Sequence, residues 1–323
     1  AALDEQGGTL STAALETRVE LRRNRLETML KVLDVDGAVQ RVGGGWRSTG
    51  AAWEYDAERY ARVAEARQAE QRAMLDYIAT GACRMQFLRE ALDDPETAPC
   101  GRCDNCGGLS LDGRVDEGEV AAAADRLNRP GVVVEPRRQW PSGMPGLGIQ
   151  LRGKVAAAEL AEPGRAVGRL SDLGWGGRLR ELLRDGSPDG ELPVPLRRAL
   201  VAVLESWDPQ PQPDGIAVVG SLSRPLLLNH LAEGLARYTG QPLLARLTPD
   251  PARPRPSAQV NSAQRLRGVH GRFRLETAAP LDGRRLLLLD DLTDSGWTLT
   301  IAARELRLAG AAAVYPLVLA LQA

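Results

Sequence analysis

The sequence has few lysines, phenylalanines and histidines. Only Lys31 and Lys154 are lysines among its 41 basic residues, and 323 residues include 2 phenylalanines and 2 histidines. His230 and His270 lie far apart in the chain, and neither is close to a cysteine or to a credible nucleophile. A catalytic triad needs a histidine between a nucleophile and an acid. The sequence gives no support for such a triad, and we assign no catalytic residue.

Long hydrophobic runs are also missing. The longest is Ala311–Ala320, whereas a membrane-spanning helix needs about 20 apolar residues. The sequence does not open with the pattern of a secretory signal peptide, in which a basic segment is followed by an apolar one. A charged fraction of 26 % argues against wholesale disorder, and a net charge of −1 excludes a uniformly basic nucleic-acid coat. We expect a cytoplasmic protein without a membrane partner, built from domains of roughly 100–150 residues each.

Cysteine is scarce but concentrated. All 4 cysteines fall within 24 residues. Disulfides are rare in a reducing cytoplasm, so clustered cysteines indicate metal or redox chemistry. Four thiolates complete a tetrahedral zinc site and leave no open position, which is typical of structural zinc. An iron–sulfur cluster and free thiols are the alternatives. The predicted zinc ligands are Cys83, Cys100, Cys103 and Cys106.

Residues 1–50 are predicted to form a winged-helix-like unit. Ser11 or Thr12 can cap a first helix, and a second helix over about 22–33 places apolar residues on one face. Two short strands are expected on either side of the glycine tip at 43–45. The alternative is a generic helical hairpin followed by a β-ribbon.

Three residues beside the glycine tip are candidates for contact with nucleic acid. The indole of Trp46 has the chemistry to stack on an unpaired base. Arg41 and Arg47 can contact the phosphate backbone. The expected partner of this unit is single-stranded or junction DNA.

The rest of the chain divides into three further parts. Residues 51–110 are expected to be helical and contain the cysteines, and residues 111–155 combine a helix, a strand and a linker rich in glycine and proline. Residues 156–323 alternate strands and helices, with apolar strand signals at 216–220 and 286–289, which favours a parallel sheet. The expected fold class is therefore multidomain, with α and α/β parts.

A second group of residues follows the leucines at 286–289. Asp290 and Asp291 end the predicted strand, where α/β proteins bind ligands, and carboxylates there can hold ribose hydroxyls or Mg²⁺. A loop of small residues then leads into a helix, whose N-terminal amides and dipole favour a phosphate. Gly296 allows the backbone to approach a ligand closely. The other loop residues expected to line this site are Thr293, Asp294, Ser295 and Thr298.

The stretch ACRMQFLREALDDPETAPCGRCDNC, within residues 52–108, resembles the zinc-binding subdomain of RecQ-family DNA helicases. There a cysteine followed by arginine begins a helix, and a C-G-x-C-D-x-C knuckle completes the site. The resemblance implies the C-terminal accessory part of an ATP-dependent 3′-to-5′ DNA helicase active in DNA repair, with ATPase lobes upstream as partners. ATP is then expected only in those lobes, because the P-loop-like string at 148–155 lacks the hydroxyl that holds Mg²⁺. Familiar RecQ proteins place their winged helix after the zinc site, whereas the candidate here precedes it.

The pattern LLLLDDLTDSGWT at 286–298 resembles the phosphoribosyl-pyrophosphate loop of type I phosphoribosyltransferases. The whole of 214–323 is similar to the competence-associated ComF type. VVGSLSRP resembles the pyrophosphate loop of that family, which implies a ligand-binding role for Ser221 and Arg224. The arginine-rich stretch 251–275 corresponds to the loop that closes over substrate. The resemblance implies a phosphate-bearing ligand together with Mg²⁺.

Two other functions are compatible with these features. One is a stand-alone phosphoribosyltransferase with an appended zinc module. The other is a non-enzymatic adaptor that binds nucleic acid. Salt-dependent DNA binding favours a nucleic-acid-binding role, whereas release of pyrophosphate from phosphoribosyl pyrophosphate favours the transferase.

Overall fold

The chain divides into two compact units. The computed structural model describes residues 2–5, 7–95, 98–108, 113–253 and 261–322. One unit combines residues 1–51 with residues 122–323, and the other consists of residues 52–121. Residues 1–50 and 156–323, which the sequence assigned to separate domains, therefore belong to the same unit.

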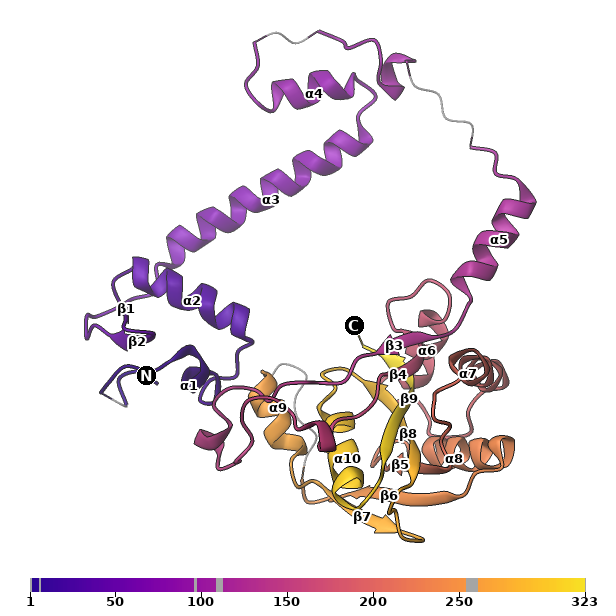
Figure 1. Ribbon diagram of the computed structural model, residues 1–323. Coiled ribbons are helices and arrows are strands. Elements are labelled where there is room, and N and C mark those ends of the chain that lie inside the picture. The colour runs from indigo at the N-terminus through magenta and orange to yellow at the C-terminus, as the bar shows by residue number, and fades with distance from the viewer. Residues whose placement is uncertain (1, 6, 96–97, 109–112, 254–260, 323) are drawn as a thin grey trace. The chain divides into compact units, whose positions relative to one another are not determined.

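A seven-stranded sheet forms the centre of the larger unit (Figure 1). The strand order is β3-β4-β9-β8-β5-β6-β7. The strands from β4 to β6 in this order are parallel, whereas β3 and β7 at the edges run antiparallel to their neighbours. The strands are β3 (Val132–Val134), β4 (Gly164–Arg169), β5 (Gly215–Val219), β6 (Leu243–Pro249), β7 (Phe273–Thr277), β8 (Arg285–Thr293) and β9 (Ala313–Leu321).

The central strands are those with the longest apolar runs. β8 buries the four leucines from Leu286 to Leu289, and β5 and β9 are buried along almost their whole length. Parallel strands covered by helices on both faces need such runs, because neither face meets water. The mixed α/β class predicted from the sequence is confirmed by this sheet.

Helices cover both faces of the sheet. On one face α6, α7 and α8 pack their leucines against β5 and β9. On the other face α10 packs Leu299, Ala302 and Leu306 against β8. Figure 1 shows α7 and α8 on the opposite side of the sheet from α9 and α10. These helices are α6 (Gly176–Leu183), α7 (Val194–Trp207), α8 (Pro225–Thr239), α9 (Ser262–Val269) and α10 (Trp297–Leu308).

The segment predicted as a connector is packed into the larger unit. Residues 132–134 form the edge strand β3, and the following stretch contains short 3₁₀ turns at Met144–Leu147 and Ala157–Glu159. Trp140 and Met144 are buried together with apolar residues of α9 and α10. The glycine and proline content of this stretch suggested a linker, but its tryptophan and methionine provide core contacts.

Residues 1–51 contain two helices followed by a two-stranded hairpin. Ser11 caps α1 by accepting a hydrogen bond from the amide of Ala14. Leu26 and Leu30 of α2 are buried in a small core that also includes Trp46. The helix–helix–hairpin order predicted from the sequence is present, with α1 (Thr12–Glu16), α2 (Arg23–Val35), β1 (Val39–Val42) and β2 (Gly45–Ser48).

In the smaller unit, residues 52–121, the regular secondary structure of the described residues is all helical. Its main element is α3 (Ala57–Ala79), followed by α4 (Arg84–Glu90) and the 3₁₀ turn η1 (Asp104–Cys106). A further helix, α5 (Glu117–Leu127), crosses the boundary between the two units. Among the described residues of the chain, no helix has the length and apolar character needed to cross a membrane.

Candidate functional site

The four cysteines predicted as zinc ligands converge in the smaller unit. Their sulfur atoms all lie within 4.8 Å of one another. A zinc ion with Zn–S bonds of 2.3 Å needs sulfurs about 3.8 Å apart at the corners of a tetrahedron. Cys83 comes from the start of α4, and the other three come from the knuckle around η1. The donor set therefore fits zinc, in a site with no place for a substrate.

The local hydrogen bonds prepare these thiols unequally for metal binding. Cys83 Sγ accepts hydrogen bonds from the amides of Cys100 (3.2 Å) and Gln86 (3.5 Å). These donors stabilise the thiolate and lower the pKa of Cys83 to about 6. The pKa of Cys106 is raised to about 11, first of all by its hydrogen bond with Cys103. A divalent cation at the centre supplies the positive charge that allows all four sulfurs to act as thiolates.

Contacts around the knuckle attach it to the end of α3. The Arg84 guanidinium donates to Asp104 (2.8 and 2.9 Å) and to the carbonyl of Tyr77 (2.6 Å). Asn105 donates to the carbonyls of Thr80 and Ala82, each at 2.7 Å. Arg84 directly follows the ligand Cys83, and Asn105 directly precedes the ligand Cys106. Metal binding and the end of α3 are therefore structurally connected.

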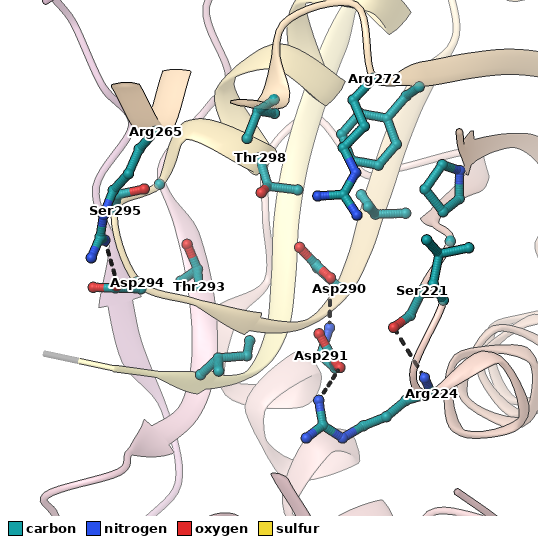
Figure 2. Close-up of a pocket in the computed structure, with 18 of the residues that line it drawn as sticks. Ser221, Arg224, Arg265, Arg272, Asp290, Asp291, Thr293, Asp294, Ser295 and Thr298 are labelled. Carbon is teal, nitrogen blue, oxygen red and sulfur yellow. Dashed lines mark hydrogen bonds and ion pairs between the residues drawn. The ribbon is translucent and has the colours of Figure 1, made fainter. Parts of the chain in front are cut away.

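The second predicted site is a cavity of about 400 Å³ in the larger unit. It lies where the loops after β5 and β8 meet. After β5 the chain continues to β6 on one side of this strand pair, and after β8 it continues to β9 on the other side. Such a switch point is where open α/β sheets bind ligands. All of the pocket residues predicted from the sequence line this cavity, and most are labelled in Figure 2: Ser221, Arg224, Asp290, Asp291, Thr293, Asp294, Ser295, Gly296 and Thr298.

The loop after β8 leads directly into the N-terminus of α10. Gly296 has a φ of +76°, a conformation that favours glycine, and no side chain caps the helix. The first amides of α10 consequently have no acceptor within the helix and face the loop. Trp297 is 2 % exposed and packs beneath the loop, with its ring stacked on Trp140 at a centroid distance of 6.0 Å. Its bulk therefore does not fill the cavity.

An internal ion pair occupies the acidic end of the cavity. The Arg224 guanidinium lies 3.2 Å from Asp291, and both side chains are buried. Arg224 also donates to the carbonyls of Leu183 and Arg184. Asp290 accepts a hydrogen bond from the amide of Asp291 at 2.9 Å. Arg224 was predicted to bind a ligand. In the structure, its guanidinium forms the ion pair with Asp291.

Two further arginines line the cavity beside the predicted residues. Arg265 of α9 forms an ion pair with Asp294, which compensates the negative charge of that loop residue. Arg272 is buried, and Figure 2 shows its guanidinium pointing toward Asp290. Both belong to the arginine-rich stretch 251–275, whose central part at 254–260 lies outside the described residues. The sequence indicated the stretch but not which arginines reach the cavity.

Of the three residues predicted to contact DNA, two are exposed and one is buried. Trp46 is only 7 % exposed and packs in the small core of residues 1–51, where its main chain also bridges to Leu10. The prediction that its ring stacks on a base is therefore wrong, because the indole is needed for that core. Arg41 and Arg47 are exposed on the two strands of the hairpin.

Residues 52–107 match the family model described as RecQ zinc-binding. This match includes all four cysteines. Together with their convergence in the structure, it confirms the structural zinc site that the sequence predicted. No curated protein matches the chain.

Two solved structures similar to this chain are phosphoribosyltransferases. A purine phosphoribosyltransferase from Pyrococcus horikoshii Ot3 is 17 % identical, with 40 % of this chain and 80 % of that chain covered and a TM-score of 0.27. A hypoxanthine-guanine-xanthine phosphoribosyltransferase is 10 % identical, with 39 % and 74 % covered and a TM-score of 0.22.

Proposed function

We propose that this chain is an accessory part of a RecQ-like DNA helicase. The observation that carries the proposal is the RecQ zinc-binding match at 52–107 together with the convergence of its four cysteines. ATP hydrolysis, 3′-to-5′ movement and a role in DNA repair belong to the proposal through the RecQ resemblance. The ATPase lobes that move along DNA are the proposed partners of the zinc unit.

The surface of α3 supports such a partner. The helix has 23 residues, and none of them is buried. Met74, Leu75 and Ile78 each expose more than half of their surface near its C-terminal end. Exposed apolar side chains gathered in this way are typical of protein interfaces. In the proposed helicase, the ATPase lobes cover this end of α3 and the zinc site keeps it in position.

DNA contact is proposed for the hairpin of residues 39–48. We expect the double substitution of Arg41 and Arg47 by alanine to weaken binding of single-stranded or junction DNA. Each lost phosphate contact should lower the slope of log affinity against log salt by about one unit. Fluorescence anisotropy at several salt concentrations measures both quantities.

The matched control for this experiment replaces two exposed arginines of α7, Arg197 and Arg198, by alanine. It removes the same charge from a helix that is distant in the sequence from the hairpin. If both double variants lower the affinity and the slope equally, the hairpin has no particular role and general charge explains the binding.

We also propose that the cavity binds a phosphate-bearing ligand together with Mg²⁺. The support is the position of the loop at the N-terminus of α10, beside Asp290 and Asp291. The loop amides and the hydroxyls of Ser295 and Thr298 are the proposed phosphate ligands. Transfer of the phosphoribosyl group is the second candidate function, and release of pyrophosphate from phosphoribosyl pyrophosphate tests it.

Replacement of Ser295 by aspartate should abolish ligand binding at the cavity. A carboxylate at this position repels a phosphate and removes a hydroxyl donor. Calorimetric titration with phosphoribosyl pyrophosphate and Mg²⁺ should give heat for the unmodified protein and none for the variant. Ser206→Asp adds the same charge at an exposed position of α7 and should leave binding unchanged. An absence of heat in the unmodified protein at millimolar ligand would contradict the proposed pocket.

A further inference from the structure

The helix α9 is attached to the amino-terminal helices by the side chains of Asn261 and Gln264. Asn261, immediately before α9, is 3 % exposed. Its Nδ2 lies within hydrogen-bond distance of three main-chain carbonyls, one at the end of α1 and two in the segment that leads to α2. Its Oδ1 caps α9 by accepting from the amide of Gln264 at 3.0 Å. Gln264 Nε2 adds contacts to two of the same carbonyls. The carbonyls contacted by Asn261 belong to Glu16, Val19 and Leu21.

The same helix is attached to the loop of the cavity. Ser262 Oγ accepts a hydrogen bond from Trp297 Nε1 at 2.9 Å, directly after the loop. Arg265 forms its ion pair with Asp294 inside the loop. The eight-residue helix α9 therefore contacts the first residue of α10 through Ser262 and the cavity loop through Arg265. On its other side, the cap residue Asn261 and Gln264 contact the amino-terminal segment.

From this arrangement we propose that α9 couples the cavity to the amino-terminal helices. Occupation of the cavity by a phosphate-bearing ligand strengthens the attachment of residues 12–35 to the rest of the unit. The inference rests on the proposed function of the cavity and adds a consequence of its occupation. It also connects ligand binding to the hairpin that carries Arg41 and Arg47, since that hairpin shares a core with α2.

The physical basis is the charge on the loop. A ligand can shift an equilibrium only if it interacts differently with its two states. A phosphate beside Asp294 adds negative charge where Arg265 already lies, so it favours the state in which α9 is held against the loop. In that state Asn261 is fixed beneath the carbonyls of the amino-terminal helices. When α9 moves away from the loop, the phosphate loses Arg265 and the three carbonyls lose Asn261.

Coupling of this kind is reciprocal and can be measured from both sides. Bound phosphoribosyl pyrophosphate with Mg²⁺ should slow amide hydrogen exchange in residues 12–35 by about fivefold or more. Asn261→Asp keeps the cap of α9 but turns the three donated hydrogen bonds into repulsive contacts. This variant should lose the effect of ligand on exchange, and its affinity for the ligand should fall by about the same factor.

Asn24→Asp is the control, because it adds the same charge at an exposed position of α2. It should retain both the ligand-dependent protection and the affinity. Ligand binding without a change of exchange in residues 12–35 overturns the coupling and leaves the proposed pocket intact. An equal affinity in Asn261→Asp and the unmodified protein overturns it as well. If the ligand does not bind the unmodified protein, the proposed pocket and the coupling both fail.

Discussion

Removal of zinc by a strong chelator should unfold residues 52–107 while the seven-stranded sheet remains folded. Among the described residues of the smaller unit, Cys83 is the only buried one, and it is a zinc ligand. The unit thus has almost no apolar core of its own. In small zinc domains at neutral pH, zinc binding contributes about 10–16 kcal/mol to the free energy of folding. The other contacts of this unit cannot replace a contribution of that size.

The expected measurement is a loss of helical signal in circular dichroism that matches α3 and α4, with the main melting transition unchanged. Elemental analysis of the untreated protein should give one zinc per chain. Cys103→Ala should reproduce the effect of the chelator. Arg102→Ala, in the same knuckle but exposed, should not. Iron and sulfide in the analysis, or full helicity after chelation, would contradict the prediction.

The elements that were predicted correctly are those whose signals come from residues close together in the sequence. The zinc ligands were identifiable because three of them lie within seven residues and Cys83 lies a short distance before them. The strand β8 and the start of α10 were identifiable because a leucine run, two acids and a small-residue loop follow one another directly. Local spacing of this kind can be read directly from the sequence, without knowledge of tertiary contacts.

The features that the sequence did not predict depend on contacts between distant residues. The edge strand β7 and the packing of Trp140 require the finished sheet and helices around them. The burial of Trp46 follows from its contacts with α1 and α2, which its position beside a glycine tip does not reveal. The partner of Arg224 is 67 residues away, and no pattern within either segment indicates the pair.

Replacement of Arg224 by alanine should destabilise the larger unit strongly. The variant leaves the buried carboxylate of Asp291 without its cation, and removing one partner of a buried ion pair costs about 3–5 kcal/mol. For a unit of this size, the melting temperature should fall by something on the order of 10 °C. Differential scanning calorimetry measures the shift.

A second ion pair provides the matched control. Arg237 and Glu233 on α8 lie 3.8 Å apart, but both side chains are mostly exposed. Exposed pairs contribute at most about 1 kcal/mol, so Arg237→Ala should change the melting temperature only slightly. The double variant Arg224→Ala with Asp291→Asn should recover part of the lost stability, because it removes the isolated buried charge. Equal shifts for Arg224→Ala and Arg237→Ala would show that the Arg224–Asp291 pair does not hold the acidic end of the cavity together.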